Sequence, residues 1–140
     1  MLISSESINK LAEKISSSNE VFCSGLFLSA RWFVVSQLDY DGMQLVVLPD
    51  KETAEYCAAD LYNLVEGDNI FFLPDSGKSL EKSNYKSTLG VQRTSAVGKI
   101  IDHKNGVLVI VTYPAALEEK VPDAASIKES VLKLSQGDEI

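Results

Sequence analysis

The sequence contains few of the side chains that hold metals or act as nucleophiles: two cysteines and one histidine in 140 residues. Cys23 and Cys57 lie in apolar stretches without the CxxC spacing of a zinc or redox site, so we expect reduced thiols in the core. No apolar run approaches the roughly 20 residues of a membrane helix, and the first residues lack the basic start and long apolar stretch of a secretory signal. We therefore expect a cytoplasmic protein without a membrane contact.

Positive charge is also scarce. The chain has 13 Lys and Arg against 20 Asp and Glu, which gives a formal net charge of −7. Because phosphate backbones are held by basic surfaces, this balance argues against a protein whose main task is to grip nucleic acid. Apolar residues make up 45% of the chain and charged residues 24%, as in globular proteins. Length and composition together predict one folded domain with its own core.

Short apolar runs alternate with stretches of helical periodicity. We expect strands at 20–25, 44–48, 69–74 and 107–112, helices at 4–17, 28–38, 89–103 and 115–120, and a further helix that Asp50 caps and Gly67 ends. Continuous apolar runs are typical of strands buried on both faces of a parallel sheet. The pattern predicts an α/β fold with three layers, a mainly parallel sheet with helices on both faces, P-loop NTPase-like but degenerate. The polar stretch 75–88 is predicted to be a long loop.

The pattern divides the chain into three parts. Residues 1–19 form an N-terminal helix, residues 20–122 form the P-loop NTPase-like α/β domain with a degenerate nucleotide site, and residues 123–140 form a tail. The tail opens like a strand and stops at its end without a continuation. We expect it to lead towards a following domain that is absent from this chain, which would make the sequence a piece of a longer protein.

The first expected strand-to-helix turn comes close to a phosphate-binding P-loop. The pattern G-x-x-x-x-G-K-S/T needs glycines whose N–H groups wrap the phosphates, a lysine, and a hydroxyl that ligates Mg²⁺. Gly25 supplies the first glycine, but Ser29 is followed by Ala30, Arg31 and Trp32 at the last three positions. Ala30 adds a Cβ, Arg31 replaces a compact ammonium, and Trp32 removes the metal ligand. A degenerate P-loop is one interpretation, and a chance match of a strand-glycine-helix turn is the other.

Two further nucleotide signals fail. The tetrapeptide SGKS at 76–79 resembles the end of a P-loop, but the position five residues before Gly77 is Phe72, inside an expected strand. No acidic pair follows the strand at 107–112, so the carboxylates that would hold a metal and activate water are missing there. The sequence therefore predicts no catalytic residue, no metal site and no bound cofactor in this chain.

Four segments, in order, resemble one family. GLFLSAR at 25–31, LVVLPDKETAEYCAAD at 45–60, IFFLPD at 70–75 and VLVIVTYPAALEEKVP at 107–122 are similar to the N-terminal region of bacterial transcription-repair coupling factor. That region is similar in turn to the first helicase-like domain of UvrB, a component of the UvrABC excinuclease. In UvrB the first segment is a working P-loop; in the coupling factor it is degenerate, as here. The short polar stretch 75–88 agrees with the shortened hairpin region of the coupling factor.

The resemblance implies a non-catalytic scaffold or interaction domain that does not bind ATP. The parent protein would be an ATP-dependent DNA translocase that displaces stalled RNA polymerase and recruits nucleotide-excision repair, with ATP and Mg²⁺ bound in its later motor domains. The implied partners are other domains of the parent chain, RNA polymerase, DNA, and the excinuclease component UvrA, the last mainly through the following domain.

Two alternatives stay open. The first is a nucleotide-binding domain that uses the turn Gly25–Arg31. The second is a nucleic-acid or interdomain contact made by five basic residues that are accompanied by one acid, Glu81: Lys78, Lys82, Lys86, Arg93 and Lys99. A solvated surface is the plainer interpretation of the same charges. His103 lies where an expected helix ends and a turn begins, a position at which a cation is mildly favoured, and no nucleophile motif accompanies it.

Overall fold

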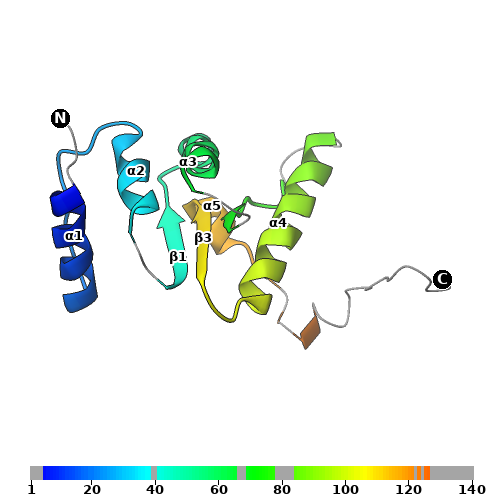
Figure 1. The fold of residues 1–140 in the computed structure, drawn as a ribbon. Helices are drawn as coiled ribbons and strands as arrows, with labels where there is room; N and C mark the ends of the chain where they lie inside the picture. The colour runs from blue at the N-terminus through cyan, green and yellow to red at the C-terminus, as the bar shows by residue number, and fades with distance from the viewer. Residues whose placement is uncertain are drawn as a thin grey trace.

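A computed structural model describes residues 5–38, 41–65, 69–77, 84–121, 123, 125 and 126 of the chain. Its elements, in chain order, are α1 (Ser5–Ser17), α2 (Ala30–Ser36), β1 (Gly42–Val47), α3 (Lys51–Leu64), β2 (Ile70–Phe72), α4 (Asn84–Asp102), β3 (Val107–Thr112) and α5 (Pro114–Glu118) (Figure 1). This alternation of helices and strands confirms the expected mixed α/β class.

The three strands form one parallel sheet in the order β1-β3-β2. The last strand that the structure describes, β3, is therefore the central one, with Leu45 of β1 and Phe71 of β2 both in register with its Ile110. Five of the six residues of β3 are buried. Its composition, five apolar residues and a threonine, suits a position with neighbours on both edges and helices packed against it.

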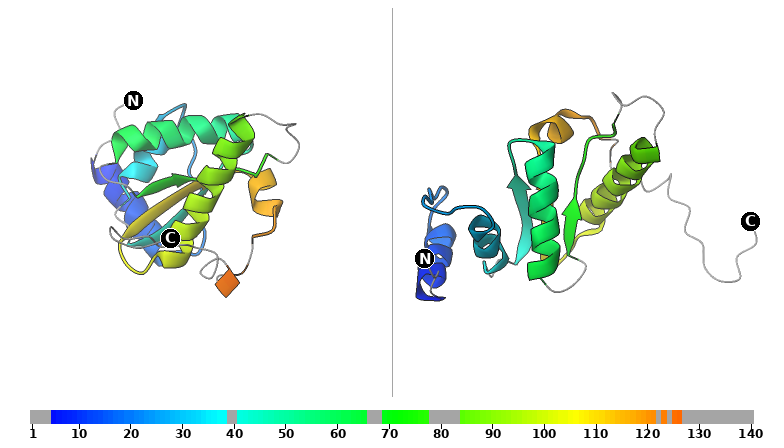
Figure 2. Two further views of the ribbon diagram at one scale, coloured as in Figure 1. Left: turned by 90° about the vertical axis from the view of Figure 1, so that its right-hand side faces the viewer. Right: turned by 90° about the horizontal axis from the view of Figure 1, so that it is seen from above.

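Helices cover β3 from two sides. Val109 and Val111 pack in a cluster that contains Leu61 of α3 and Trp32 of α2. Leu108 and Ile110 pack in a second cluster, which contains Ala96 and Val97 of α4. Since successive strand residues point to opposite faces, α2 and α3 lie against one face of β3 and α4 lies against the other. The left view of Figure 2 shows α4 crossing in front of the sheet.

The sequence explains α3 in detail. The Asp50 carboxylate accepts a hydrogen bond from the Thr53 N–H at 2.8 Å, which satisfies one of the free donors of the first turn. The buried residues follow at helical spacing: Ala54, Cys57, Ala58 and Leu61. The predicted cap and buried face are thus confirmed. The helix ends at Leu64, and Gly67, expected to end it, lies outside the described residues.

The expected first strand at 20–25 is wrong. Residues 20–27 form neither helix nor strand in the structure, and the sheet has three strands where we expected four. The run offers only Val21, Phe22 and Cys23 as consecutive apolar residues, and the side chain of Phe22 is 92% exposed. A strand of a covered parallel sheet must bury both faces, and this segment buries neither.

Several element ends also differ from expectation. The helix expected at 28–38 is shorter, at Ala30–Ser36, and the one expected at 89–103 begins earlier, at Asn84, within the stretch predicted to be loop. Pro114 occupies the first turn of α5, where a missing N–H costs nothing. The predicted N-terminal helix is present as α1, which lies beyond α2 on the side away from the sheet (Figure 2). Most of the tail from 123 lies outside the described residues.

Candidate functional site

The expected nucleotide turn leads into α2, which packs against α3. Gly25 has φ +81°, a conformation that favours glycine, and an added Cβ there would meet nothing within 4 Å. Three residues further on, Leu28 has φ +49°, which is uncommon for a branched side chain. The turn is therefore sharply bent, although no strand precedes it.

Three main-chain donors at the start of α2 are already used. The N–H of Ala30 donates to the Phe27 carbonyl at 3.1 Å, that of Arg31 to the Leu28 carbonyl at 3.4 Å, and that of Phe33 to the Ser29 carbonyl at 3.0 Å. A phosphate site at a helix start depends on N–H groups that are free to point at the anion. The turn lacks such free donors at these three positions.

Three side chains at the end of the turn contact other parts of the protein, although only that of Trp32 is buried. Trp32 is only 7% exposed and belongs to the cluster under α3. The Arg31 guanidinium lies over the Trp32 ring, 4.6 Å from its centroid. The Ser29 hydroxyl donates to the Asp60 carboxylate of α3 at 2.6 Å. Asp60 thus places a negative charge beside the turn, and this charge would repel a phosphate bound there.

A hollow of about 340 Å³ opens beside the turn, lined by Leu28, Ser29, Arg31, Trp32, Thr53, Tyr56 and Asp60. It contains one cation and one carboxylate. Cys57 is buried nearby; burial raises the pKa of its thiol to about 12, with the negative charge of Asp60 acting in the same direction and Arg31 against it. A thiol in this state stays protonated at neutral pH and does not act as a nucleophile.

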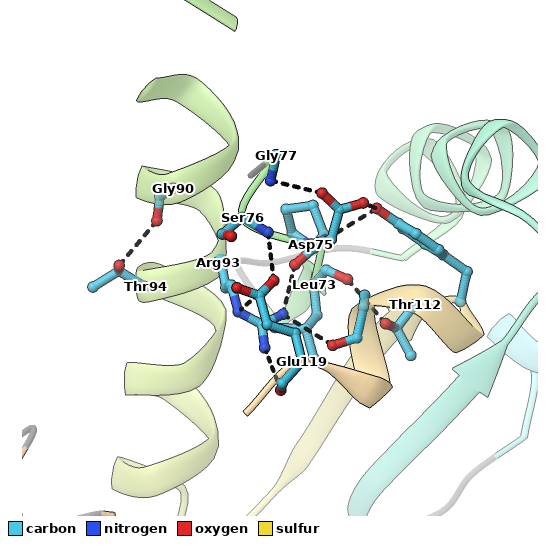
Figure 3. A network of polar contacts seen from close by, with 12 residues as sticks. Leu73, Asp75, Ser76, Gly77, Gly90, Arg93, Thr94, Thr112 and Glu119 are labelled. Carbon is cyan, nitrogen blue, oxygen red and sulfur yellow. Dashed lines mark hydrogen bonds and ion pairs between the residues drawn. The ribbon is translucent and has the colours of Figure 1, made fainter. Parts of the chain in front are cut away.

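A second polar cluster lies at the carboxyl ends of β2 and β3 (Figure 3). Arg93 of α4 is 8% exposed, and its guanidinium donates to the carbonyls of Pro74 at 2.7 Å, Ala116 at 3.1 Å and Glu119 at 3.0 Å. Its Nε lies 3.8 Å from the carboxylate of Glu119, which is itself largely buried. Arg93 therefore ties α4 to the segment after β2 and to α5.

The loop after β2 completes this cluster. The Tyr113 hydroxyl donates to the Asp75 carboxylate at 2.6 Å and accepts from the Asp75 N–H at 3.0 Å, while the Ser76 N–H donates to the Glu119 carboxylate at 2.7 Å. Burial, and then the hydrogen bond to Asp75, raise the pKa of Tyr113 above its ordinary value. The side-chain hydroxyl of Ser76 is buried without a hydrogen-bond partner. With nearly every polar group paired internally, the cluster joins elements of the fold.

The five predicted basic contact residues do not share one described surface. Lys78 and Lys82 lie outside the described residues, as does the side chain of Lys86 in the first turns of α4. Arg93 is buried, and Lys99 is exposed with its Nζ 5.4 Å from the Phe71 ring centroid. Sequence reasoning counted Arg93 as a surface charge and missed its place in the core. A signal for it existed: Leu89, Arg93, Ala96 and Val97 follow helical spacing on one face.

A metal centre and a membrane-spanning helix are two other kinds of site. The described residues contain no group of three or more His, Cys, Asp and Glu side chains placed to hold a metal ion. Within the same residues, none of the helices has the length and apolar character needed to cross a membrane. His103 lies with Lys99 and Lys104 around a hollow at the end of α4, which Asp102 and Asn105 also line.

Comparison of the chain with protein-family models, with curated proteins and with solved structures gave no match to any of them.

Proposed function

We propose that this chain is a non-catalytic interaction domain of a larger cytoplasmic protein, similar to the UvrB-like region of transcription-repair coupling factor. In this proposal the fold is a three-layer, P-loop NTPase-like domain whose nucleotide site has degenerated. The segment binds no ATP and catalyses no reaction. Its role is to hold or recruit other proteins while motor domains elsewhere in the parent chain hydrolyse ATP and move along DNA.

The Ser29–Asp60 hydrogen bond supports the loss of nucleotide binding most directly. In a working P-loop the corresponding end of the turn carries a lysine and a Mg²⁺-binding hydroxyl. Here a 2.6 Å bond joins the turn to a carboxylate, and Trp32 occupies the core. Restoring a phosphate site would require breaking this bond, freeing main-chain donors and removing a negative charge. The missing strand before the turn is a departure from the family pattern, so the proposal depends on the side chains of the turn and on the four similar segments.

The parent activity follows from the same proposal. A coupling factor would displace a stalled RNA polymerase by ATP-driven translocation and bring in UvrA through the domain that follows this one. This chain would contribute the scaffold on which that following domain is built. No residue of this chain is assigned to the UvrA contact.

A titration of nucleotide tests the proposal. Trp32 is the single tryptophan, and it lies beside the turn, so its emission reports on any ligand that displaces Arg31 or Ser29. We expect no saturable change with Mg-ATP or Mg-ADP up to about 5 mM. This concentration exceeds the Michaelis constants of typical enzymes, which lie between roughly 1 µM and 1 mM. A saturable response that is lost in Arg31→Ala and kept in the matched control Lys104→Ala would contradict it.

Nucleic-acid binding is the second candidate function. It is favoured by the grouping of Lys99, His103 and Lys104 around one hollow. Electrostatic binding is strongest at low salt, so anisotropy of labelled forked DNA at about 50 mM salt is the sensitive test. Binding that Lys99→Glu weakens and added salt abolishes would establish this function. The absence of any anisotropy change at about 50 µM protein would remove it.

A further inference from the structure

The outer edge of β1 has main-chain groups with no strand beside them. In the part of the chain that the structure describes, β1 pairs with β3 alone. The N–H of Gly42 donates to the Gly106 carbonyl and that of Leu48 to the Thr112 carbonyl, so the even-numbered residues direct their main-chain groups towards β3. Main-chain direction alternates along a strand, and the N–H and C=O groups of Met43, Leu45 and Val47 therefore point away from the sheet.

The side chains of the same three residues form an open apolar strip. Met43 is 40% exposed, Leu45 54% and Val47 49%. Their neighbours in register on β3 are covered: Leu108 is 4% exposed and Ile110 is fully buried, because α4 packs over them. The helix that covers this face thus stops short of β1.

β1 also lacks the features that prevent an edge strand from pairing with another chain. Natural edge strands carry lysine, proline or an inward charge, and β1 has none of these in the sequence GMQLVV. The two acids that flank β1 are hydrogen-bonded within the chain. The Asp41 carboxylate accepts a hydrogen bond from the Gly106 N–H, and the Asp50 carboxylate caps α3. In a chain of net charge −7, this is an uncharged edge that another strand can approach without meeting a carboxylate.

We propose that β1 pairs with β1 of a second copy of this chain, antiparallel and with Leu45 on the two-fold axis. In this register Leu45 faces Leu45 and Met43 faces Val47. All three are residues whose main-chain groups point outward, so each pair exchanges two hydrogen bonds. The two-fold axis keeps the apolar strips of both copies on one face of a continuous six-stranded sheet.

The charge distribution favours contact between two copies through the β1 edge over contact through other surfaces. An isologous contact brings a surface against itself, so a surface with unpaired acids would oppose like charges, which is destabilising. In the Leu45-centred register Asp41 lies across from Pro49 of the second copy, and no acid of 41–49 faces another acid. With Gln44 on the axis instead, Val47 would face Asp41, which lies outside β1, and only the Met43–Leu45 pairs would exchange hydrogen bonds within the strand.

Sedimentation of the full chain tests the association. We expect the mass to rise from 15.3 kDa towards twice that value between about 5 and about 300 µM protein. Leu45→Lys places two like charges on the axis and should weaken dimerisation by about tenfold or more. Val91→Lys, at a 70% exposed position of α4, is the matched control and should leave it unchanged. A monomer at every concentration, or a dimer that Leu45→Lys leaves intact, would overturn the proposal.

Thiol cross-linking tests the register separately, in a Cys23→Ser background that removes the exposed native thiol. Paired residues lie about 5.5 Å apart between Cα atoms, within reach of a disulfide. Leu45→Cys should therefore cross-link with itself on mild oxidation. Met43→Cys alone should not, but should cross-link when mixed with Val47→Cys. Self-linking of Met43→Cys as fast as that of Leu45→Cys, or failure of Leu45→Cys to link in a dimeric sample, would contradict this arrangement.

Discussion

Arg93 of α4 holds Glu119 twice: its guanidinium donates to the Glu119 carbonyl at 3.0 Å, and its Nε lies 3.8 Å from the Glu119 carboxylate. The same guanidinium binds the Pro74 and Ala116 carbonyls, so one side chain satisfies three main-chain carbonyls on two segments, the loop after β2 and α5 with its C-cap. A planar fork of five donors suits this arrangement, and an ammonium does not.

Replacing Arg93 should therefore destabilise the fold strongly. Arg93→Met leaves the largely buried Glu119 carboxylate without its cation and three carbonyls without their donor, and we expect a loss of about 3–5 kcal/mol in the free energy of unfolding. Arg93→Lys keeps the charge but reaches fewer carbonyls, and should lose about 1–3 kcal/mol. Urea denaturation measures both. Gln92→Ala, at the exposed neighbouring position, is the control and should stay within about 0.5 kcal/mol of the parent.

Tyr113 should make stability fall at alkaline pH. Its pKa is raised in the fold, so the unfolded chain loses the phenolic proton first, near pH 10, and each further rise in pH favours the unfolded state. Tyr113→Phe removes this contribution and leaves Asp75 without two hydrogen bonds. We expect about 1–2 kcal/mol lower stability at neutral pH and a shallower decline above about pH 10. Unfolding curves from pH 7 to 11 provide the measurement. If the free energy of unfolding falls with pH as steeply in Tyr113→Phe as in the parent, the fold does not raise the pKa of Tyr113.

The two cysteines should differ sharply in reactivity. The expectation of a core thiol is confirmed for Cys57, which is fully buried on α3 with its pKa raised to about 12, and is wrong for Cys23, which is exposed. At pH 8 we expect one thiol to react with a chromogenic disulfide in the native protein, and two in denaturant. Cys23→Ser should abolish the native reaction. A second thiol reacting at the same rate in folded protein would mean that α3 opens readily from the sheet.

Asp50 should contribute stability that acid removes. The main-chain hydrogen bond from Thr53 holds the pKa of Asp50 below its ordinary value, so its contribution is complete above about pH 4 and is lost as the pH falls through the folded pKa. Asp50→Asn retains a capping oxygen and should remove mainly the pH dependence. Asp50→Ala removes the cap and should lower the melting temperature by a few degrees. Thermal unfolding at pH 3 and pH 7 separates the two effects.

The sequence predicted the parts of the fold whose pattern is local. Asp50 before the periodic residues of α3 predicted that helix, and the uncharged run at 107–112 predicted the strand β3, whose central position in the sheet was not predicted. The first turns of α4 were missed because they are polar and give no periodic signal. The strand at 20–25 was wrong because three consecutive apolar residues can also be left in solvent, and only tertiary packing decides between the two outcomes.

The candidate site shows the same limit. Ala30, Arg31 and Trp32 are reason enough to doubt a nucleotide, but nothing in their spacing indicates that Ser29 bonds to Asp60, 31 residues away. Arg93 was misassigned because net charge was counted along the chain, while burial depends on the face of the helix. Residues that are distant in sequence become partners only when the sheet forms, and no local sequence pattern indicates such pairs.

The strand order has a consequence for how the chain folds during synthesis. Of the three strands that the structure describes, β3 is made last and joins the other two, since β1 and β2 each pair with it and not with each other. A growing chain that has reached residue 106 therefore holds two apolar strands without a partner. Non-local parallel pairing of this kind is slow, and the waiting strands are open to aggregation. We expect chains that stop before Val107 to need a chaperone, and chains whose residues up to Thr112 have left the ribosome to resist protease.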